Sequence, residues 1–164
     1  MTSQPLPKNT PEIKFYAKDD PYGWMSNFYR AEIFIRGEWY ATSEHYYQSS
    51  KAVYPDDREW IRAAPTPHKA FKATRALKPE EIWPYWDEVK LDIMREAIWA
   101  KFTQHPNLRK MLMETGEAIL IENSPVDSFW GCGKDGKGEN WLGKLLMELR
   151  HDFCFIPQYC EAVQ

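Results

Sequence analysis

The chain has 164 residues, of which 43% are hydrophobic and 27% charged, so its composition is that of one globular domain and not of a disordered or repetitive chain. Its 21 basic and 24 acidic residues give a net charge of -3, which excludes a strong global attraction to nucleic acids or anionic membranes. Aromatic residues make up 15% of the chain, and such rings either fill a core or stack on planar ligands such as nucleobases.

The three cysteines, Cys132, Cys154 and Cys160, are odd in number and lack CxxC spacing, so we expect neither a disulfide framework nor a cysteine zinc site. No apolar run follows a basic start, and no stretch approaches the ~18 apolar residues of a membrane span. We therefore expect a cytoplasmic protein, or a nuclear one if the source is eukaryotic, with no membrane partner.

The first part of the chain predicts a tail followed by strands. Residues 1–12 hold three prolines and few apolar groups, which predicts a flexible N-terminal tail and a folded domain over 13–164. Extended apolar patterns run over 13–16 and over 31–40, the second interrupted by a turn at Arg36-Gly37. Together these patterns predict a small antiparallel sheet.

Helical patterns dominate the rest of the chain. Helices are expected over 43–54, ended by Pro55, over 68–74, 87–103 and 106–115, and from Asn140 onward, with a loop over 77–86. No internal repeat is present, which excludes solenoids and propellers. The predicted fold class is therefore α+β: a single compact, predominantly helical domain with a small antiparallel sheet.

The most unusual stretch is residues 130–140, WGCGKDGKGEN, with four glycines. It satisfies GxGxxG literally, but too little chain follows for the βαβ unit and acidic residue of a dinucleotide site. It also nearly satisfies the P-loop pattern, except that Gly138 stands where the magnesium-binding Ser or Thr should be. Neither a dinucleotide-binding fold nor an NTPase is indicated.

What remains is a glycine loop opening onto a helix N-terminus, where backbone N–H groups and the helix dipole favour a phosphate or diphosphate. Asp135 has two interpretations, a turn former that bonds its own backbone or a residue that acts on ribose. Asn140 is either a helix cap or a ligand-binding residue. The residues expected to bind substrate here are Gly133, Lys134, Gly136, Lys137, Gly138 and Asn140.

A second candidate site lies in the helix that begins near residue 43. Glu44, Tyr47, Gln48 and Lys51 follow i, i+3, i+4 and i+7 spacing and share one face. An acid in the first helical turn also simply complements the helix dipole, and His45 beside it is a binding residue or a structural one. The chain has neither the HExxH motif of a zinc enzyme nor the GxSxG motif of a serine hydrolase. Catalysis by carboxylates is the remaining type that its residues support.

Three motifs taken together, GWMSNF, WYATSEHYYQSSKA and WGCGKDGKGENWLGKLLMELR, resemble the NADAR (YbiA-like) family over Phe15–Arg150. The resemblance implies a YbiA-like fold and an N-glycosidase that acts on ribosyl carbon–nitrogen bonds. When the family's functional residues are transferred to this sequence, the acids of the second and third motifs are Glu44 and Asp135, and the resemblance implies that these are the catalytic residues. Asn27 of the first motif is expected to bind substrate.

Hydrolysis of such a bond passes through an oxocarbenium-like sugar, which needs a carboxylate near C1′ and a means of making the base leave. Glu44 and Asp135 can supply both, in either division of roles, so we expect no metal and no cofactor. Rings are expected to stack on a base or adenine, with core packing as the alternative for Trp99; the candidates are Trp24, Tyr47, Trp99 and Trp130.

The first candidate function is removal of ADP-ribose from ADP-ribosylated guanine bases, with ADP-ribosylated DNA or RNA as partner. The second is an N-glycosidase of the phosphoribosylamino-pyrimidine intermediates of riboflavin biosynthesis. A candidate of another class is a non-catalytic ADP-ribose-binding module. Glu44 discriminates, because a binding module would tolerate the neutral amide at that position whereas a hydrolase would not.

Overall fold

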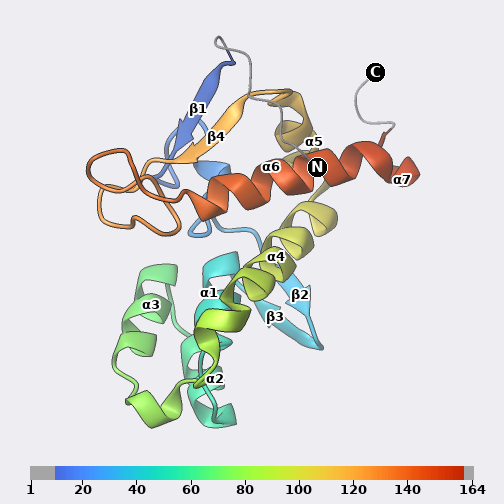
Figure 1. The fold of residues 1–164 in the computed structure, drawn as a ribbon. Helices are drawn as coiled ribbons and strands as arrows, with labels where there is room; N and C mark the ends of the chain where they lie inside the picture. The colour runs from blue at the N-terminus through green and yellow to red at the C-terminus, as the bar shows by residue number, and fades with distance from the viewer. Residues whose placement is uncertain (1–9, 161–164) are drawn as a thin grey trace. The chain divides into compact units, whose positions relative to one another are not determined.

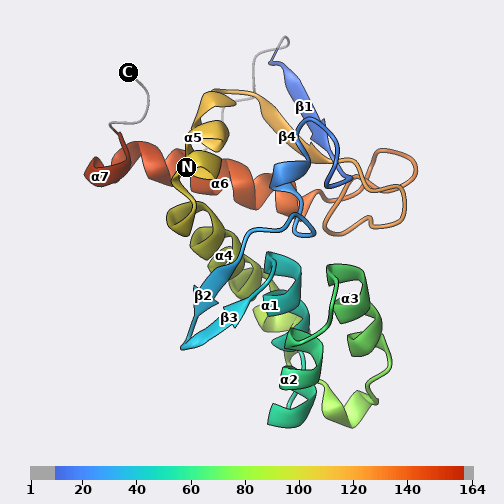
Figure 2. The same cartoon turned by 180° about the vertical axis from the view of Figure 1, so that it is seen from behind.

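The computed structural model of the chain describes residues 10–160, which form two compact units. The central unit is Asn27–Arg109, and the terminal unit combines the described parts of Met1–Ser26 and Lys110–Gln164. Helices dominate and the strands are short, which confirms the predicted α+β class (Figures 1 and 2). Most of the predicted N-terminal tail, residues 1–9, lies outside the described residues.

The central unit begins with an antiparallel hairpin of β2 (Ile33–Ile35) and β3 (Glu38–Tyr40), as the alternating pattern predicts. The turn between them is Arg36-Gly37, and both residues have positive φ, at 54° and 89°. This backbone twist matches that of a two-residue hairpin, and a glycine at the second position adopts it without strain.

Helix α1 (Ser43–Ser49) follows the hairpin, and Thr42 caps it by accepting a hydrogen bond from the N–H of His45. The expectation that this helix runs to residue 54 and is ended by Pro55 was wrong. Pro55 instead begins α2 (Pro55–Arg62), because its fixed φ and missing N–H suit the first helical position and keep Tyr54 extended.

The central unit continues with α3 (Pro67–Arg75), a 3-10 turn at Pro79–Glu81 and the long helix α4 (Trp86–Gln104). α1 contacts α2, α3 and α4, and Figure 1 shows it among them. One hydrophobic cluster joins Ile33, Ile35, Tyr46, Ala97 and Ala100, and a second joins Ala52, Ile61, Ala70 and Ala73. All seven residues of α1 are buried, including its polar ones.

The terminal unit contains a pairing that sequence analysis missed. β1 (Glu12–Phe15) does not join the hairpin but pairs in parallel with β4 (Ile119–Glu122), so that Glu12 lies opposite Ile119. Parallel strands need a long crossover connection, and here most of the chain lies between the two strands. Glu12, expected at the end of the tail, is therefore already part of a strand.

Helix α6 (Trp141–Phe155) contacts β4 and precedes α7 (Pro157–Cys160), while α5 (Pro106–Glu114) precedes β4 (Figure 2). The leucine stripe of α6 is buried, as its spacing predicts. A Cβ added at Gly143 would meet the Leu120 carbonyl oxygen at 2.1 Å, so only glycine allows this approach of helix and strand. No helix in the described part of the chain is long and apolar enough to cross a membrane.

Candidate functional site

The polar face of α1 is the first part of the predicted site, and we call Glu44, Tyr47, Gln48 and Lys51 the Glu44 face. The Glu44 side chain is only 6% exposed, and its Oε1 accepts a 2.6 Å hydrogen bond from Nε2 of Gln48, one helical turn on. A buried carboxylate is costly unless it is hydrogen-bonded or meets positive charge. Gln48 therefore orients Glu44, and the helix places both side chains where the spacing predicted.

Three residues next to Glu44 each carry a buried polar atom with no hydrogen-bond partner among residues 10–160: Oδ1 of Asn27, whose backbone oxygen bonds the Glu44 N–H, Oγ of Ser43, the residue before Glu44, and Oε1 of Gln48, whose Nε2 bonds Glu44. Each such atom costs about 1–3 kcal/mol when it is kept from water without a partner. In native structures, the large majority of buried polar atoms have a hydrogen-bond partner. The cluster is therefore suited to receive the hydroxyl or N–H groups of a bound molecule.

Asn27 reaches this cluster from the chain just before the hairpin. Its backbone oxygen accepts a 3.2 Å hydrogen bond from the N–H of Glu44, and its Nδ2 lies 3.2 Å from Sδ of Met94 on α4. These contacts fix the side chain and leave Oδ1 as its unsatisfied atom. The structure thus brings the Asn27 backbone to Glu44, while its expected role in binding substrate stays a prediction.

Aromatic groups adjoin the Glu44 face. The ring of Tyr47 lies edge-on to Trp86 with 5.1 Å between centroids, and Nζ of Lys51 lies 4.7 Å from the Tyr47 centroid and 5.6 Å from that of Trp86. Sequence analysis missed Trp86, because Tyr47 and Trp86 are 39 positions apart in the chain and no local spacing rule reaches that far. Ser43 was also missed as a polar group of the site.

His45 is held by the protein on both sides of its ring. Nε2 lies 3.0 Å from the carbonyl oxygen of Ala64, so it carries the proton, and Nδ1 lies 2.8 Å from Oγ1 of Thr42. Burial lowers the pKa of His45 below its ordinary value, which favours the neutral ring. Its ring ties α1 to residue 64, which is the structural role sequence analysis had left open.

The glycine loop, residues 131–140 of the terminal unit, uses most of its own N–H donors. Those of residues 132–133 and 136–140 donate to acceptors within this unit over 2.7–3.3 Å. Within 131–140, all of it described, the N–H groups of Gly131, Lys134 and Asp135 are the ones without such an acceptor. The loop therefore offers a phosphate few backbone donors, fewer than its glycine content predicted.

Side chains of the loop divide into exposed and engaged groups. Lys134, Asp135 and Lys137 are exposed, and Oδ1 of Asp135 accepts a 3.1 Å hydrogen bond from the N–H of Lys137. Both ends of the Asn140 amide bond to β4, through the N–H of Glu122 and the carbonyl oxygen of Leu120. The structure thus shows Asp135 as a turn former, whereas Asn140, which stands at the N-cap position of α6, makes no side-chain capping hydrogen bond there and ties the helix start to β4 instead.

The remaining predicted stacking residues lie in different places. Trp24 is buried in a 3-10 turn of the terminal unit, and Trp130 packs edge-on to Phe129 there, 5.0 Å between centroids. Trp99 is 40% exposed on α4, which is more than core packing explains. Across residues 10–160, no three or more His, Cys, Asp and Glu side chains are grouped to hold a metal ion.

Comparisons with known proteins extend these observations. The NADAR domain profile matches residues 14–154. The N-glycosidase Npun_R5314 of Nostoc punctiforme is 45% identical over 147 residues, which cover 85% of this chain and 91% of that protein. The riboflavin biosynthesis protein PYRR, chloroplastic, of Zea mays is 38% identical over 160 residues, covering 89% of this chain but 26% of that protein.

The N-glycosidase YbiA of Escherichia coli is 43% identical over 138 residues, covering 84% of this chain and 86% of that protein. Its NMR structure aligns with a TM-score of 0.81 and 42% identity, over 88% of this chain and 86% of that one. These matches confirm the expected fold and the expected class of enzyme, a hydrolase of N-glycosyl bonds.

Proposed function

The chain belongs to the NADAR domain family, and from that premise we propose that it hydrolyses the bond between a ribose carbon and a base nitrogen at the Glu44 face. The observation that carries the proposal is the buried Glu44 carboxylate beside acceptor atoms of Asn27 and Gln48 that have no partner among the described residues. A carboxylate removed from bulk water attracts a nearby cation strongly. Acceptors that lack donors suit the hydroxyl groups of a sugar.

The reaction needs a protein group that stabilises the ribosyl cation of the transition state. As the C1′–N bond breaks, its electron pair leaves on the base nitrogen, and a water oxygen forms the new bond to C1′. Glu44 stabilises the cation and takes the proton that the water loses, while Gln48 keeps the carboxylate oriented through their 2.6 Å hydrogen bond. Glu44 then passes this proton, directly or through water, to the departing base nitrogen, so the carboxylate is regenerated and the products are a free ribose hydroxyl and a neutral base.

One ring next to the Glu44 face is open enough to bind a base. Tyr47 is only 4% exposed and packs in the core, whereas Trp86, edge-on to it, is partly exposed. Stacking on such a ring contributes about 1–3 kcal/mol per base and does not depend on which base is bound, because every base has a flat face. Trp86 therefore supports base binding without selecting among bases.

The glycine loop of the terminal unit carries exposed charge and offers few free backbone donors. Its exposed Lys134 and Lys137 suit a phosphate group, and Asp135 stays the second expected catalytic residue. Most of the loop's N–H groups are already bonded within the terminal unit. Phosphate affinity should therefore depend on salt, as the attraction between exposed charges does.

ADP-ribose joined to a guanine base is the first candidate substrate, and it rests on the family resemblance. It needs a stacking surface for guanine, a carboxylate near C1′ and cations for the diphosphate. The second candidate is a phosphoribosylamino-pyrimidine intermediate of riboflavin biosynthesis, which the name of the maize relative favours. Both share the ribosyl carbon–nitrogen bond, so one mechanism serves either substrate.

A side-by-side assay tests the proposal. Purified protein is incubated with an oligonucleotide carrying ADP-ribosylated guanine and, separately, with the phosphoribosylamino-pyrimidine, and base release is followed by chromatography. We expect base release from one of them at a rate at least tenfold above that from the other. If neither substrate loses its base, the proposed reaction is wrong.

A further inference from the structure

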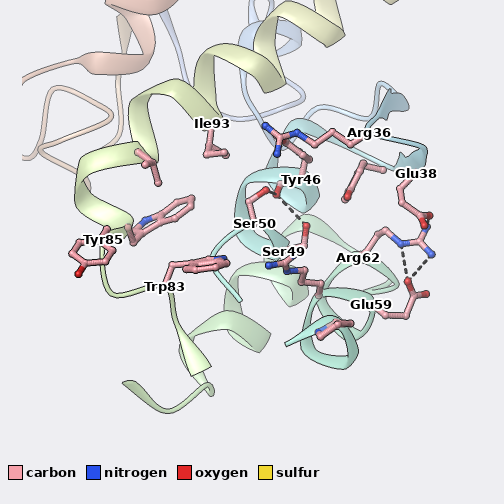
Figure 3. A pocket seen from close by; sticks show the side chains of 15 residues that line it. Arg36, Glu38, Tyr46, Ser49, Ser50, Glu59, Arg62, Trp83, Tyr85 and Ile93 are labelled. Atoms are coloured by element: carbon pink, nitrogen blue, oxygen red, sulfur yellow. Dashed lines mark hydrogen bonds and ion pairs between the residues drawn. The ribbon is translucent and has the colours of Figure 1, made fainter. Parts of the chain in front are cut away.

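A cavity of about 750 Å³ lies within the central unit, on the side of α1 away from the Glu44 face (Figure 3). Tyr46, Ser49 and Ser50 line it from α1, and helical spacing puts them opposite Glu44. The other walls come from the β2–β3 hairpin, α2 and the chain leading into α4. We call this space the aromatic cavity; its volume is typical of small-molecule sites.

Aromatic rings form part of the lining of the cavity, beside charged side chains. Trp83 and Tyr85 are 44% and 66% exposed, an unusual degree for large rings. Figure 3 shows these two rings at one end of the cavity and the Arg62–Glu59 ion pair at the other. Tyr46 is buried behind them, with its hydroxyl donating to the Glu96 carboxylate. The exposed rings give a planar ligand a surface to stack on.

The charges of the cavity leave one arginine unmatched. Arg62 pairs with Glu59 at 2.6 Å and lies 3.5 Å from Glu38, and Arg36 makes two hydrogen bonds to the Glu96 carboxylate, of 3.0 and 2.9 Å. Arg58 instead donates to backbone carbonyl oxygens, and its guanidinium lies 5.9 Å from the Trp83 centroid. No described carboxylate pairs with Arg58, so its charge is available to an anion.

We propose that the aromatic cavity binds a nucleotide unit, with the base stacked on Trp83 and Tyr85 and the phosphate held by Arg58. Nε and Nη2 of Arg58 donate to the carbonyl oxygens of Ala52 and Val53, which fixes the guanidinium and leaves its Nη1 group to donate to a phosphate oxygen. The stacking rings and the unmatched cation are thus adjacent, as the two ends of a nucleotide are. Ser49 and Ser50 also line the cavity; their hydroxyls donate to the Tyr46 carbonyl oxygen, so Ser50, the less buried of the two, can offer its oxygen as an acceptor to a ribose hydroxyl.

This site is separate from the proposed catalytic one, although both use α1. The two sets of side chains leave opposite faces of the same helix, so occupancy of the aromatic cavity requires no group that acts on the ribosyl bond. Trp86 is the exception, because it lines the cavity and also touches Tyr47. Variants for the test therefore leave Trp86 unchanged.

Titration calorimetry of the full chain tests the proposal, with AMP, adenosine and inorganic phosphate as probes. We expect saturable AMP binding, and at least tenfold weaker binding of adenosine and of phosphate, because each lacks one half of the contacts. Trp83→Ala, Tyr85→Ala and Arg58→Gln should each weaken AMP binding at least tenfold. Trp60→Ala and Arg75→Gln, which change an exposed ring and a cation outside the cavity, should change it less than twofold.

Thermal melts of each variant separate lost binding from lost folding, and Tyr85→Ala keeps the test sound because that ring is largely exposed. The Glu44→Gln variant should keep its AMP affinity even if the proposed hydrolysis proves wrong. The proposal is overturned if AMP shows no saturable binding. It is equally overturned if the folded cavity variants all bind AMP like the unaltered chain, or if Glu44→Gln alone abolishes binding.

The same nucleotide chemistry can come from a free nucleotide or from one unit of a strand. A comparison of AMP with short oligoadenylates distinguishes the two sources. Equal affinity per site supports a free nucleotide, whereas affinity that rises with length and remains sensitive to Trp83→Ala supports a strand. A rise in affinity that is insensitive to Trp83→Ala, Tyr85→Ala and Arg58→Gln places the strand elsewhere and contradicts the cavity proposal.

Discussion

Helix α1 and the glycine loop each carry an acidic residue that we expected to be catalytic, yet their polar groups have opposite surroundings. Glu44 is 6% exposed, and acceptor atoms of Asn27 and Gln48 near it lack partners among the described residues. In the loop, Asp135 is exposed and its carboxylate accepts a hydrogen bond from the N–H of Lys137.

The difference shows which of the two regions depends on a ligand. Unpaired buried acceptors cost about 1–3 kcal/mol each, and a bound molecule that donates to them recovers that free energy. The loop has already used most of its donors to hold its own shape. We therefore interpret α1 as the chemical centre and the loop as a rigid support that presents charged side chains.

The largest effect on stability is expected in the loop. A Cβ added at Gly138 would lie 2.4 Å from the Gly131 oxygen, whereas at Gly136 nothing lies within 4 Å and the strain is that of φ +72° alone. Gly138→Ala should lower the free energy of unfolding by about 3 kcal/mol. The matched Gly136→Ala should lower it by about 1 kcal/mol. Equal losses in urea titrations would show that the loop is not the rigid support described.

A smaller effect is expected from the orienting residue of α1. Gln48→Leu removes the donor that holds Glu44 while keeping the bulk of the side chain, so the rate of base release should fall about tenfold, or 1.4 kcal/mol. Gln104→Leu is the control, because Gln104 bonds the Phe34 backbone away from the Glu44 face. A Gln48→Leu enzyme with the rate of the unaltered chain would mean that Glu44 needs no such support.

The smallest effect concerns pH. Burial lowers the pKa of His45 from 6.5, so the unfolded chain binds this proton more readily, and stability should fall as pH falls below 6.5. One proton limits the slope to about 1.4 kcal/mol per pH unit. Melts between pH 8 and 5 should show this decline, and His45→Gln should flatten it. A variant with an unchanged decline would assign it to other groups.

Local signals predicted the elements whose causes are local. Thr42 caps α1, and Arg36-Gly37 forms the hairpin turn, because side-chain capping and positive φ are properties of a few neighbouring residues. The end of α1 was misplaced because a proline stops one helix as readily as it starts another. The parallel pairing of β1 and β4 was missed because its partners, such as Glu12 and Ile119, are distant in sequence.

In the candidate site, too, the features set by local spacing were predicted and those set by tertiary packing were missed. The spacing of Glu44 and Gln48 placed them on one helix face correctly, since helix periodicity fixes that relation, whereas Lys51 lies in the turn after α1 ends at Ser49. The contact of Trp86 with Tyr47 depends on how α4 packs against α1, which no spacing rule contains. The loop's internal hydrogen bonds also depend on partners outside it, such as Ser128 and Glu122, so its glycine content alone overstated its capacity to bind phosphate.

The most direct test of the account compares the two carboxylates in one assay. Single-turnover base release and the substrate Kd are measured for the unaltered chain, Glu44→Gln and Asp135→Asn. We expect Glu44→Gln to release base at least about 10²-fold more slowly with Kd within threefold, because the amide keeps the shape and loses the charge. Asp135→Asn should lose less rate than Glu44→Gln. A Glu44→Gln enzyme within a few-fold of the original rate would contradict the claim that α1 carries the chemistry.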